Sequence, residues 1–276
     1  MSDVPREFVF TRHPARQGLV WLAAAYAMFR AHRLAWVVLV LAYFLVLLMV
    51  RVVPVVGPYA MTVLKPVLAV GLLAAAWTQE RGGTPALGQL LQGFRANLWS
   101  LISIGVFFVV GITVAVFASA LVDGGKLVEL MGGDGAMSEA ELAAALADGR
   151  VQLGMAFSAL LSLPIVIATW WAPALVVFQD ARAGAALNAS LRAALANWRP
   201  LALYGLGVFF YGGVVPGLII AVIAMVLPSD AGRLFVIALL LPYSLFFAAT
   251  LHVSDYVSYR EVFHSGETLA PLSRGS

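Results

Sequence analysis

Six long apolar stretches divide the sequence, each bounded by polar residues or by Pro and Gly. They cover residues 34–55, 58–78, 98–121, 152–178, 200–227 and 233–256. A helix needs about 20 apolar residues to cross the hydrocarbon core of a bilayer, so each stretch predicts a transmembrane helix. The connections "PVVGP" and "LPSDAG" leave room only for tight antiparallel turns. The pattern predicts an all-α fold, a polytopic membrane helix bundle with six transmembrane helices.

A second pattern precedes the first, third and fifth stretches, in segments 15–32, 80–97 and 180–197. Apolar or small residues recur there at the i, i+3, i+4, i+7 spacing of one helix face. The three faces are Leu22, Ala25, Tyr26 and Phe29; Leu87, Leu90, Leu91 and Phe94; and Leu187, Ser190, Leu191 and Ala194. Each segment predicts an amphipathic helix of about four turns, lying along the membrane interface with its Arg toward lipid headgroups.

The unit of interfacial helix, outgoing span and incoming span occurs three times. Similar phrases mark two of the units, "FRANLW" with "IGVFFVVG" and "LANWRP" with "LGVFFYGG". All three units begin on the same side, which indicates parallel repeats rather than inverted ones. Within a single membrane domain we therefore expect repeats over 15–78, 80–178 with a long loop at 122–150, and 180–258, followed by a short tail at 259–276.

Basic residues predict the orientation of the bundle. Of the 17 Lys and Arg, twelve lie on the side of the two termini. The other five are Arg51, Lys65, Lys126, Arg150 and Arg233. Because Lys and Arg are enriched in cytoplasmic loops, both termini are expected in the cytoplasm. The acidic loop at 122–150 is then outside, where Ser138 and Glu141 of "SEAELAAALADG" predict a capped short helix.

Composition agrees with a membrane protein and narrows the chemistry. The chain is 62% apolar and 11% charged, with a net charge of +3 and no Cys, and its mean hydropathy is +0.94. Soluble domains carry about 25% charged residues. Disulfides, thiolate metal sites and cysteine nucleophiles are excluded. No cleavable signal peptide, cofactor, metal or nucleic-acid partner is expected, whereas membrane lipids are.

Four phrases carry a resemblance to a known family: "RQGLVWLAAAYAMFR", "KPVLAVG", "WWAPALVVF" and "SLRAALANWRPLALYG". Over nearly its whole length the chain resembles an uncharacterised family of proteobacterial six-span inner-membrane proteins. It is more distantly similar to the membrane domain found beside some glycerophosphodiester phosphodiesterases. The resemblance implies a six-span fold and a location in the bacterial inner membrane. It implies no activity, and no soluble phosphodiesterase domain can be placed in this chain.

Lys65 is the charged residue expected deepest in a span, about 12 Å along a helix from Gly57. An ammonium group at that depth is costly and is often functional. It can also extend outward, with its methylene groups in lipid. Two interpretations stay open: a structural Lys that reaches the headgroups, or an inward ligand for an anion or lipid headgroup next to the kink expected at Pro66.

The fourth and sixth spans hold the other candidate residues. Trp170 and Trp171 either pack the bundle around a kink at Pro173 or form the aromatic wall of a lipid-accessible groove. His252 and Asp255 are three residues apart and share a helix face, so they can form a polar pair. One His and one carboxylate are too few ligands for a metal site. In the fifth span, Gly207, Gly213 and Gly217 predict close helix contacts.

Three classes of function follow from these features. The leading hypothesis is a non-catalytic inner-membrane protein that contacts lipid through its interfacial helices and serves as a scaffold or in envelope homeostasis. The alternative is a transporter or lipid flippase with a polar path near Lys65. The third, an enzyme, lacks convergent polar groups and any nucleotide-binding or hydrolase motif. A protein partner or a second copy of the chain stays open.

Overall fold

The computed structural model describes residues 8–132, 138–227 and 229–265, and these residues form helices joined by short connections, without strands. Six helical segments are long and apolar enough to cross a membrane. In chain order, the helices are α1 (Gln17–Ala31), α2 (Arg33–Arg51), α3 (Gly57–Glu80), η1 (Leu87–Arg95), α4 (Leu98–Ala118), α5 (Ala120–Asp123), α6 (Lys126–Gly132), α7 (Glu139–Ala147), α8 (Gly149–Trp170), α9 (Ala172–Gln179), α10 (Ala183–Ala196), α11 (Trp198–Phe209), η2 (Phe210–Val214), α12 (Val215–Val226) and α13 (Ser229–Phe263). The six predicted spans and the all-α class are confirmed.

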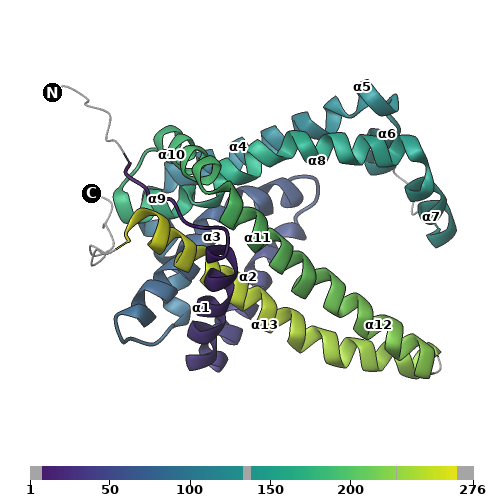
Figure 1. Ribbon diagram of the computed structural model, residues 1–276. Coiled ribbons are helices and arrows are strands. Elements are labelled where there is room, and N and C mark those ends of the chain that lie inside the picture. Colours follow the sequence, from purple (N-terminus) through teal and green to yellow (C-terminus); the bar gives the residue numbers. More distant parts are fainter. Residues whose placement is uncertain (1–7, 133–137, 228, 266–276) are drawn as a thin grey trace.

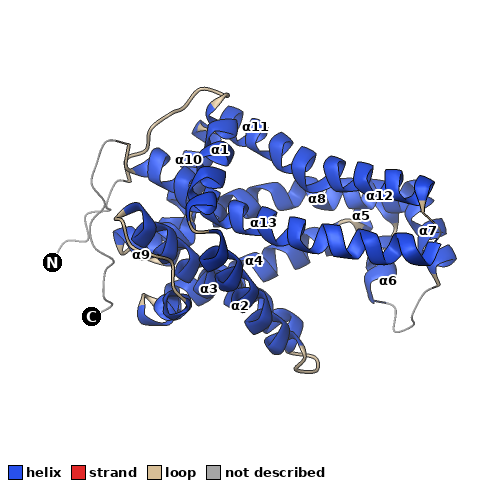
Figure 2. Cartoon of the chain, turned by 90° about the horizontal axis from the view of Figure 1, so that it is seen from below, coloured by secondary structure: helices blue, strands red, loops and turns tan. Residues whose placement is uncertain are grey.

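The spans form three helical hairpins: α2 with α3, α4 with α8, and α11–α12 with α13. They meet at the end of the molecule formed by α9, α10 and the last turns of α13, which we name the core end (Figure 1). From there the α4–α8 and α11–α13 hairpins diverge (Figure 1), and the α2–α3 hairpin points in a third direction (Figure 2). The hairpins therefore splay instead of forming a closed bundle.

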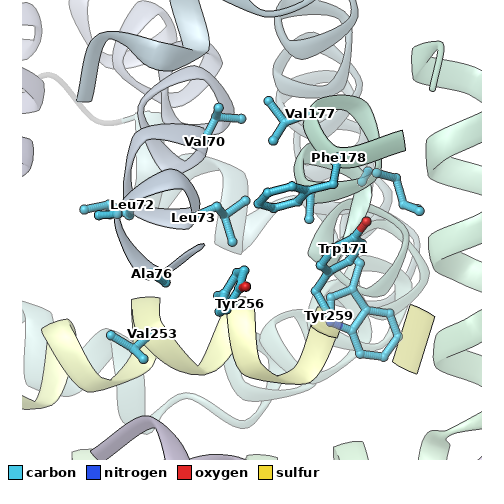
Figure 3. Packing of buried hydrophobic residues seen from close by; sticks show 14 of the residues in the cluster. Val70, Leu72, Leu73, Ala76, Trp171, Val177, Phe178, Val253, Tyr256 and Tyr259 are labelled. Carbon is cyan, nitrogen blue, oxygen red and sulfur yellow. The ribbon is translucent and has the colours of Figure 1, made fainter. Parts of the chain in front are cut away.

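The core is built around α3, which contacts α2, η1, α4, α9 and α13. Its side chains interlock with α9 and α13, where Leu73, Phe178 and Tyr256 face one another (Figure 3). On another face of α3, glycines of η1 and α4 allow the backbones of these helices to touch that of α3. A Cβ atom on Gly93 of η1 would lie 1.9 Å from the carbonyl oxygen of Val67, and one on Gly105 of α4 would lie 2.4 Å from that of Val63. Small residues at helix contacts are typical of membrane bundles, because they allow this close approach.

The three predicted amphipathic segments differ from one another. α1 buries Leu22, Ala25 and Phe29 as predicted, but Tyr26 is half exposed. α10 buries Ser190 and Ala194.

The middle segment was predicted wrongly as a four-turn helix, since η1 is a 3-10 helix of 9 residues. It buries Leu90 and Gly93 against α3, while Leu87, Leu91 and Phe94 are exposed. Gln89 points inward and donates a hydrogen bond to Thr78 Oγ1. Close contact with α3 through Gly71 and Gly93 decides which side of η1 is buried. The threefold repeat itself stays a prediction.

The loop at 122–150 contains two short helices, α6 and α7, of which the sequence predicted one, while α5 continues the third span to Asp123. α7 begins as expected: Ser138 Oγ accepts a hydrogen bond from the Glu141 N–H, and Glu141 accepts one from the Ser138 N–H. This second bond is the main reason that the pKa of Glu141 is lowered. Asp148 caps α8, accepting from the Arg150 N–H, and pairs with Lys126. The hydrogen bond from Lys126 is the largest cause of the lowered pKa of Asp148.

The last span is longer than predicted. α13 has 35 residues, or about 52 Å at a rise of 1.5 Å per residue, against a hydrocarbon core of about 30 Å. Residues 259–263, assigned from the sequence to the C-terminal tail, continue α13. The rest of the predicted tail beyond 265, and loop positions 133–137, lie outside the described residues.

Candidate functional site

The fourth span breaks into α8 and α9 at Trp171, and a serine from α10 fills the break. Ser190 Oγ accepts a hydrogen bond from the Trp171 N–H at 3.1 Å and donates one to the Ile167 carbonyl at 3.0 Å. In an unbroken helix these two backbone groups would bond to each other. Pro173 lies in the first turn of α9, where its missing N–H costs nothing. The kink therefore has an identifiable cause, a side chain inserted into the hydrogen-bond ladder.

Trp171 packs in the core, 1% exposed. Its indole N–H donates to Ser258 Oγ of α13 at 3.0 Å, and its ring makes edge contacts with Trp21 and Phe263. The surroundings of Trp171 match the bundle-packing interpretation given above.

Trp170 points to a different place, a cavity of about 30 Å³ between α3, the α8–α9 break and α13. Its Nε1 is buried without a hydrogen-bond partner among the described residues. His252 and Asp255 line the same cavity, with His252 Nδ1 3.8 Å from Asp255 Oδ2, beyond hydrogen-bond length. A water molecule needs about 10–15 Å³, so the cavity is large enough for one or two water molecules and for little else.

Lys65 lies apart from this cluster. Its side chain is on the exposed face of α3 and makes no hydrogen bond or ion pair with any residue that the structure describes. The structure thus brings together Trp170, His252 and Asp255 and leaves Lys65 outside. Within the described ranges no three His, Asp or Glu side chains gather as metal ligands.

Two carboxylates fasten α13 to the rest of the core end, and the sequence analysis assigned neither of them a partner. Glu80 of α3 accepts hydrogen bonds from the Tyr256 hydroxyl and from Arg260 Nε. Glu261 accepts from Gln17 and from Trp21 Nε1. These partners are 176 to 244 positions apart in the chain. No local spacing could have paired them, although carboxylates beside a long apolar run were a signal that they need partners.

The glycines of the fifth span were predicted only in part. A Cβ on Gly207 would lie 2.7 Å from Leu22 Cδ1, a close helix contact. Gly213 meets only its own Phe209, and nothing lies within 4 Å at Gly217. The close approach to α13 is made at Gly212 instead, 2.7 Å from Phe247 Cε1.

An all-helical fold with six helical segments that are long and apolar enough to cross a membrane is that of a polytopic membrane protein. The chain is 31% identical over 262 residues to the probable inner membrane protein BTH_II0599 of Burkholderia thailandensis, and the match covers 93% of this chain and 94% of the relative. It belongs to the family of that inner membrane protein. No family model and no solved structure matches the chain. The similarity to the phosphodiesterase membrane domain stays a prediction.

Proposed function

We propose that this protein is a non-catalytic component of the inner membrane that binds lipids along its splayed hairpins and acts as a scaffold for the surrounding bilayer. The observation that carries the proposal is that most residues of the third, fifth and sixth spans are not buried against other parts of the chain. In the 18-residue apolar stretch that characterises each span, only 6% of the residues are buried in the fifth span, 11% in the sixth and 22% in the third. Side chains such as Leu218, Leu234 and Phe235 are more than half exposed. In a membrane, this surface is covered by lipid or by other proteins.

The use of polar groups also supports a non-catalytic role. Between helices they serve mainly to join α13 to its neighbours: Trp171 with Ser258, Tyr204 with Ser254 at 2.7 Å, and Tyr256 with Glu80. Catalysis needs a nucleophile or acid–base pair that faces a site large enough for substrate. The cavity at Trp170, His252 and Asp255, at about 30 Å³, admits little more than water.

Transbilayer assays separate this function from the alternative, a transporter or lipid flippase. The purified protein would be reconstituted in vesicles that carry fluorescent phosphatidylglycerol, and dithionite would quench the outer leaflet. We expect the quenched fraction to equal that of protein-free vesicles, and native mass spectrometry to find phosphatidylglycerol retained on the protein. Complete quenching would favour the flippase. Absence of any retained lipid would contradict the scaffold.

Lys65 is the residue for which the two functions differ most. Its exposed position on α3 suits a side chain whose stem lies in lipid and whose ammonium reaches the headgroups. Lys65→Leu should then keep or raise the melting temperature in detergent, because a costly charge is removed from an apolar setting, and Lys65→Arg should be tolerated. Reduced anionic lipid on Lys65→Leu at unchanged stability would instead make Lys65 a ligand.

The same proposal places the core end, and both termini, in the cytoplasm. Because the chain has no Cys, single Cys variants can test it: Ala144→Cys on the exposed face of α7 and Ser265→Cys after α13. Ala144 is preferred to Ser138, whose hydroxyl caps α7. An impermeant maleimide added to intact spheroplasts should label Ala144→Cys and spare Ser265→Cys. The reverse labelling would invert the topology.

A further inference from the structure

A groove of about 570 Å³ opens between α1, η2 and α13, outside the site described above. α1 contributes Leu19, Ala23 and Tyr26 to its wall, and aromatic rings from η2 and α13 form the rest, among them Tyr211 and Phe246. The one Thr in the wall donates its hydroxyl proton to its own helix. The groove is therefore apolar and aromatic, and its volume falls in the range of about 300–1,000 Å³ that small-molecule sites have.

At the core end, α1 lies between α11 and α13 and holds them apart. On the α11 side, a Cβ on Gly18 would lie 2.0 Å from the carbonyl oxygen of Pro200, so the two backbones touch. On the α13 side, the rings of Phe29 and Phe246 are 5.6 Å apart. This placement leaves the other face of α1, with Tyr26, directed into the groove.

Toward the hairpin tip, the π-helix η2 closes the groove. The Val215 N–H bonds to the Phe210 carbonyl, as a π turn requires. The Tyr211 carbonyl accepts a hydrogen bond from the Tyr243 hydroxyl of α13. Gly212 brings η2 close to Phe247. The groove is thus held open at one end by α1 and fastened at the other by η2, without a further ligand.

The surroundings of the groove point to one kind of occupant. Tyr211 lies about 20 Å along the fifth span from Trp198, counted at 1.5 Å per residue, and the α13 side of the groove lies within the sixth span. Because both helices belong to membrane-capable spans, the groove opens toward lipid in a bilayer. One turn beyond Tyr26, the Arg30 guanidinium lies 6.0 Å from the Tyr26 ring centroid and is exposed. Guanidinium binds phosphate in a bidentate manner, and a ring contact of this kind keeps it in place.

We propose that this groove is a binding site for an anionic phospholipid, with one acyl chain between α1, η2 and α13 and the phosphate on Arg30. The inference rests on the proposed lipid-binding function and names its site. It separates a specific lipid from those that merely surround the spans. Arg30, Tyr26 and Tyr243 then determine which lipid stays bound when the membrane is dissolved.

A matched pair of substitutions tests the site. Ala23→Trp fills the groove, and Ala27→Trp adds the same ring one turn later on α1, where Ala27 is exposed but does not line the groove. Each variant, extracted from vesicles of phosphatidylglycerol and phosphatidylcholine, would be weighed by native mass spectrometry. We expect Ala23→Trp to lose one retained phosphatidylglycerol and Ala27→Trp to match wild type. Leu19→Trp, also in the wall, serves as the second groove-filling variant if Ala23→Trp does not fold.

The role of the Arg30 charge in binding the phosphate is tested separately. Arg30→Gln should weaken phosphatidylglycerol retention about tenfold or more, because a charge-assisted hydrogen bond is lost, while Arg30→Lys should retain most of it. Arg16→Gln, at the other end of α1, is the control and should change nothing.

The outcomes keep the two proposals distinct. If wild type retains lipid but Ala23→Trp and Ala27→Trp behave alike, the groove is not the site, although the protein still binds lipid. If wild type retains none, the proposed function fails as well. A wild-type dimer that Ala23→Trp converts to a monomer would show that a second copy, and not a lipid, occupies the groove.

Discussion

α3 and the α11–α13 hairpin are both apolar spans, but they have opposite surroundings. Over the 18-residue apolar stretch of each span, 56% of the residues of α3 are buried at a mean hydropathy of 1.7, whereas 6% and 11% are buried in the fifth and sixth spans at a mean hydropathy of 2.3. The more exposed helices are thus the more hydrophobic ones. α3 carries Ala74, Ala75 and Ala76 and Gly71 where neighbours pack. In this protein, therefore, the helix packed among other helices is rich in small residues, whereas the helices that face lipid are rich in large apolar residues.

Truncation of a leucine in each region should separate them most strongly. Leu68 of α3 is 2% exposed, and Leu218 of α12 is 60% exposed. Leu68→Ala should cost about 2–5 kcal/mol, because a cavity is left in a packed core. Leu218→Ala should change stability by less than about 0.5 kcal/mol. Unfolding in mixed micelles of increasing SDS content measures both, and equal losses would mean that α12 is also packed, for example against a second copy.

The close backbone contact of α3 with η1 should be nearly as sensitive. Gly93→Ala places a methyl group 1.9 Å from the Val67 carbonyl oxygen, and overpacking of this kind costs about 1–3 kcal/mol. In the same helix nothing lies within 4 Å of a Cβ on Gly88, so Gly88→Ala should be neutral. The measurement is the melting temperature in detergent, and a stable Gly93→Ala would show that η1 can move away from α3 at little cost.

Ser190 should matter for the break in the fourth span. Ser190→Ala leaves the Trp171 N–H and the Ile167 carbonyl unpaired in a buried place, which costs about 1–3 kcal/mol for each unsatisfied group. Ser162 of α8 is the control, since its hydroxyl only donates to the Ser158 carbonyl of its own helix. Ser162→Ala should leave the melting temperature unchanged. A Ser190→Ala protein as stable as wild type would mean that α8 and α9 re-form one continuous helix.

The smallest effect is expected in the loop outside the core. The pKa values of Glu141 and Asp148 are lowered in the folded protein, chiefly by hydrogen bonds from the Ser138 N–H and from Lys126. Their contribution to stability is therefore complete at neutral pH and is lost in acid, as pH falls through the lowered pKa values. Limited proteolysis should cut near α7 faster in acid than at neutral pH, while the core end stays resistant. Asp148→Asn should reproduce part of this effect at neutral pH, and equal cleavage rates would contradict it.

Much of the fold could be predicted from local sequence pattern. The six spans agree with the observed helices because hydrophobicity over about 20 residues is enough to define a crossing helix. The α7 cap was visible for a similar reason, since Ser138 and Glu141 act within one turn. That His252 and Asp255 share a helix face also follows from helix geometry, although His252 Nδ1 and Asp255 Oδ2 are 3.8 Å apart, beyond hydrogen-bond length.

The predictions that were wrong concerned contacts between residues far apart in the chain. The apolar spacing of 80–97 is the same whether that face meets lipid or protein, so it could not show that Leu90 and Gly93, and not Leu87 and Phe94, pack on α3. The glycine pair in the fifth span was chosen by spacing, whereas the contact at Gly212 depends on the position of Phe247.

Local sequence pattern was enough to predict the class of protein, the six spans and the loop cap, because each depends on residues within about one helix length of one another. Which apolar faces are buried, that Ser190 fills the break at Trp171, and that Trp170, His252 and Asp255 line one cavity while Lys65 lies outside it all depend on contacts between distant helices. Only the tertiary structure revealed the groove, since α1, η2 and α13 come from opposite ends of the chain. In a membrane protein lipid and core are equally apolar, so hydrophobicity defines the spans but cannot select their neighbours.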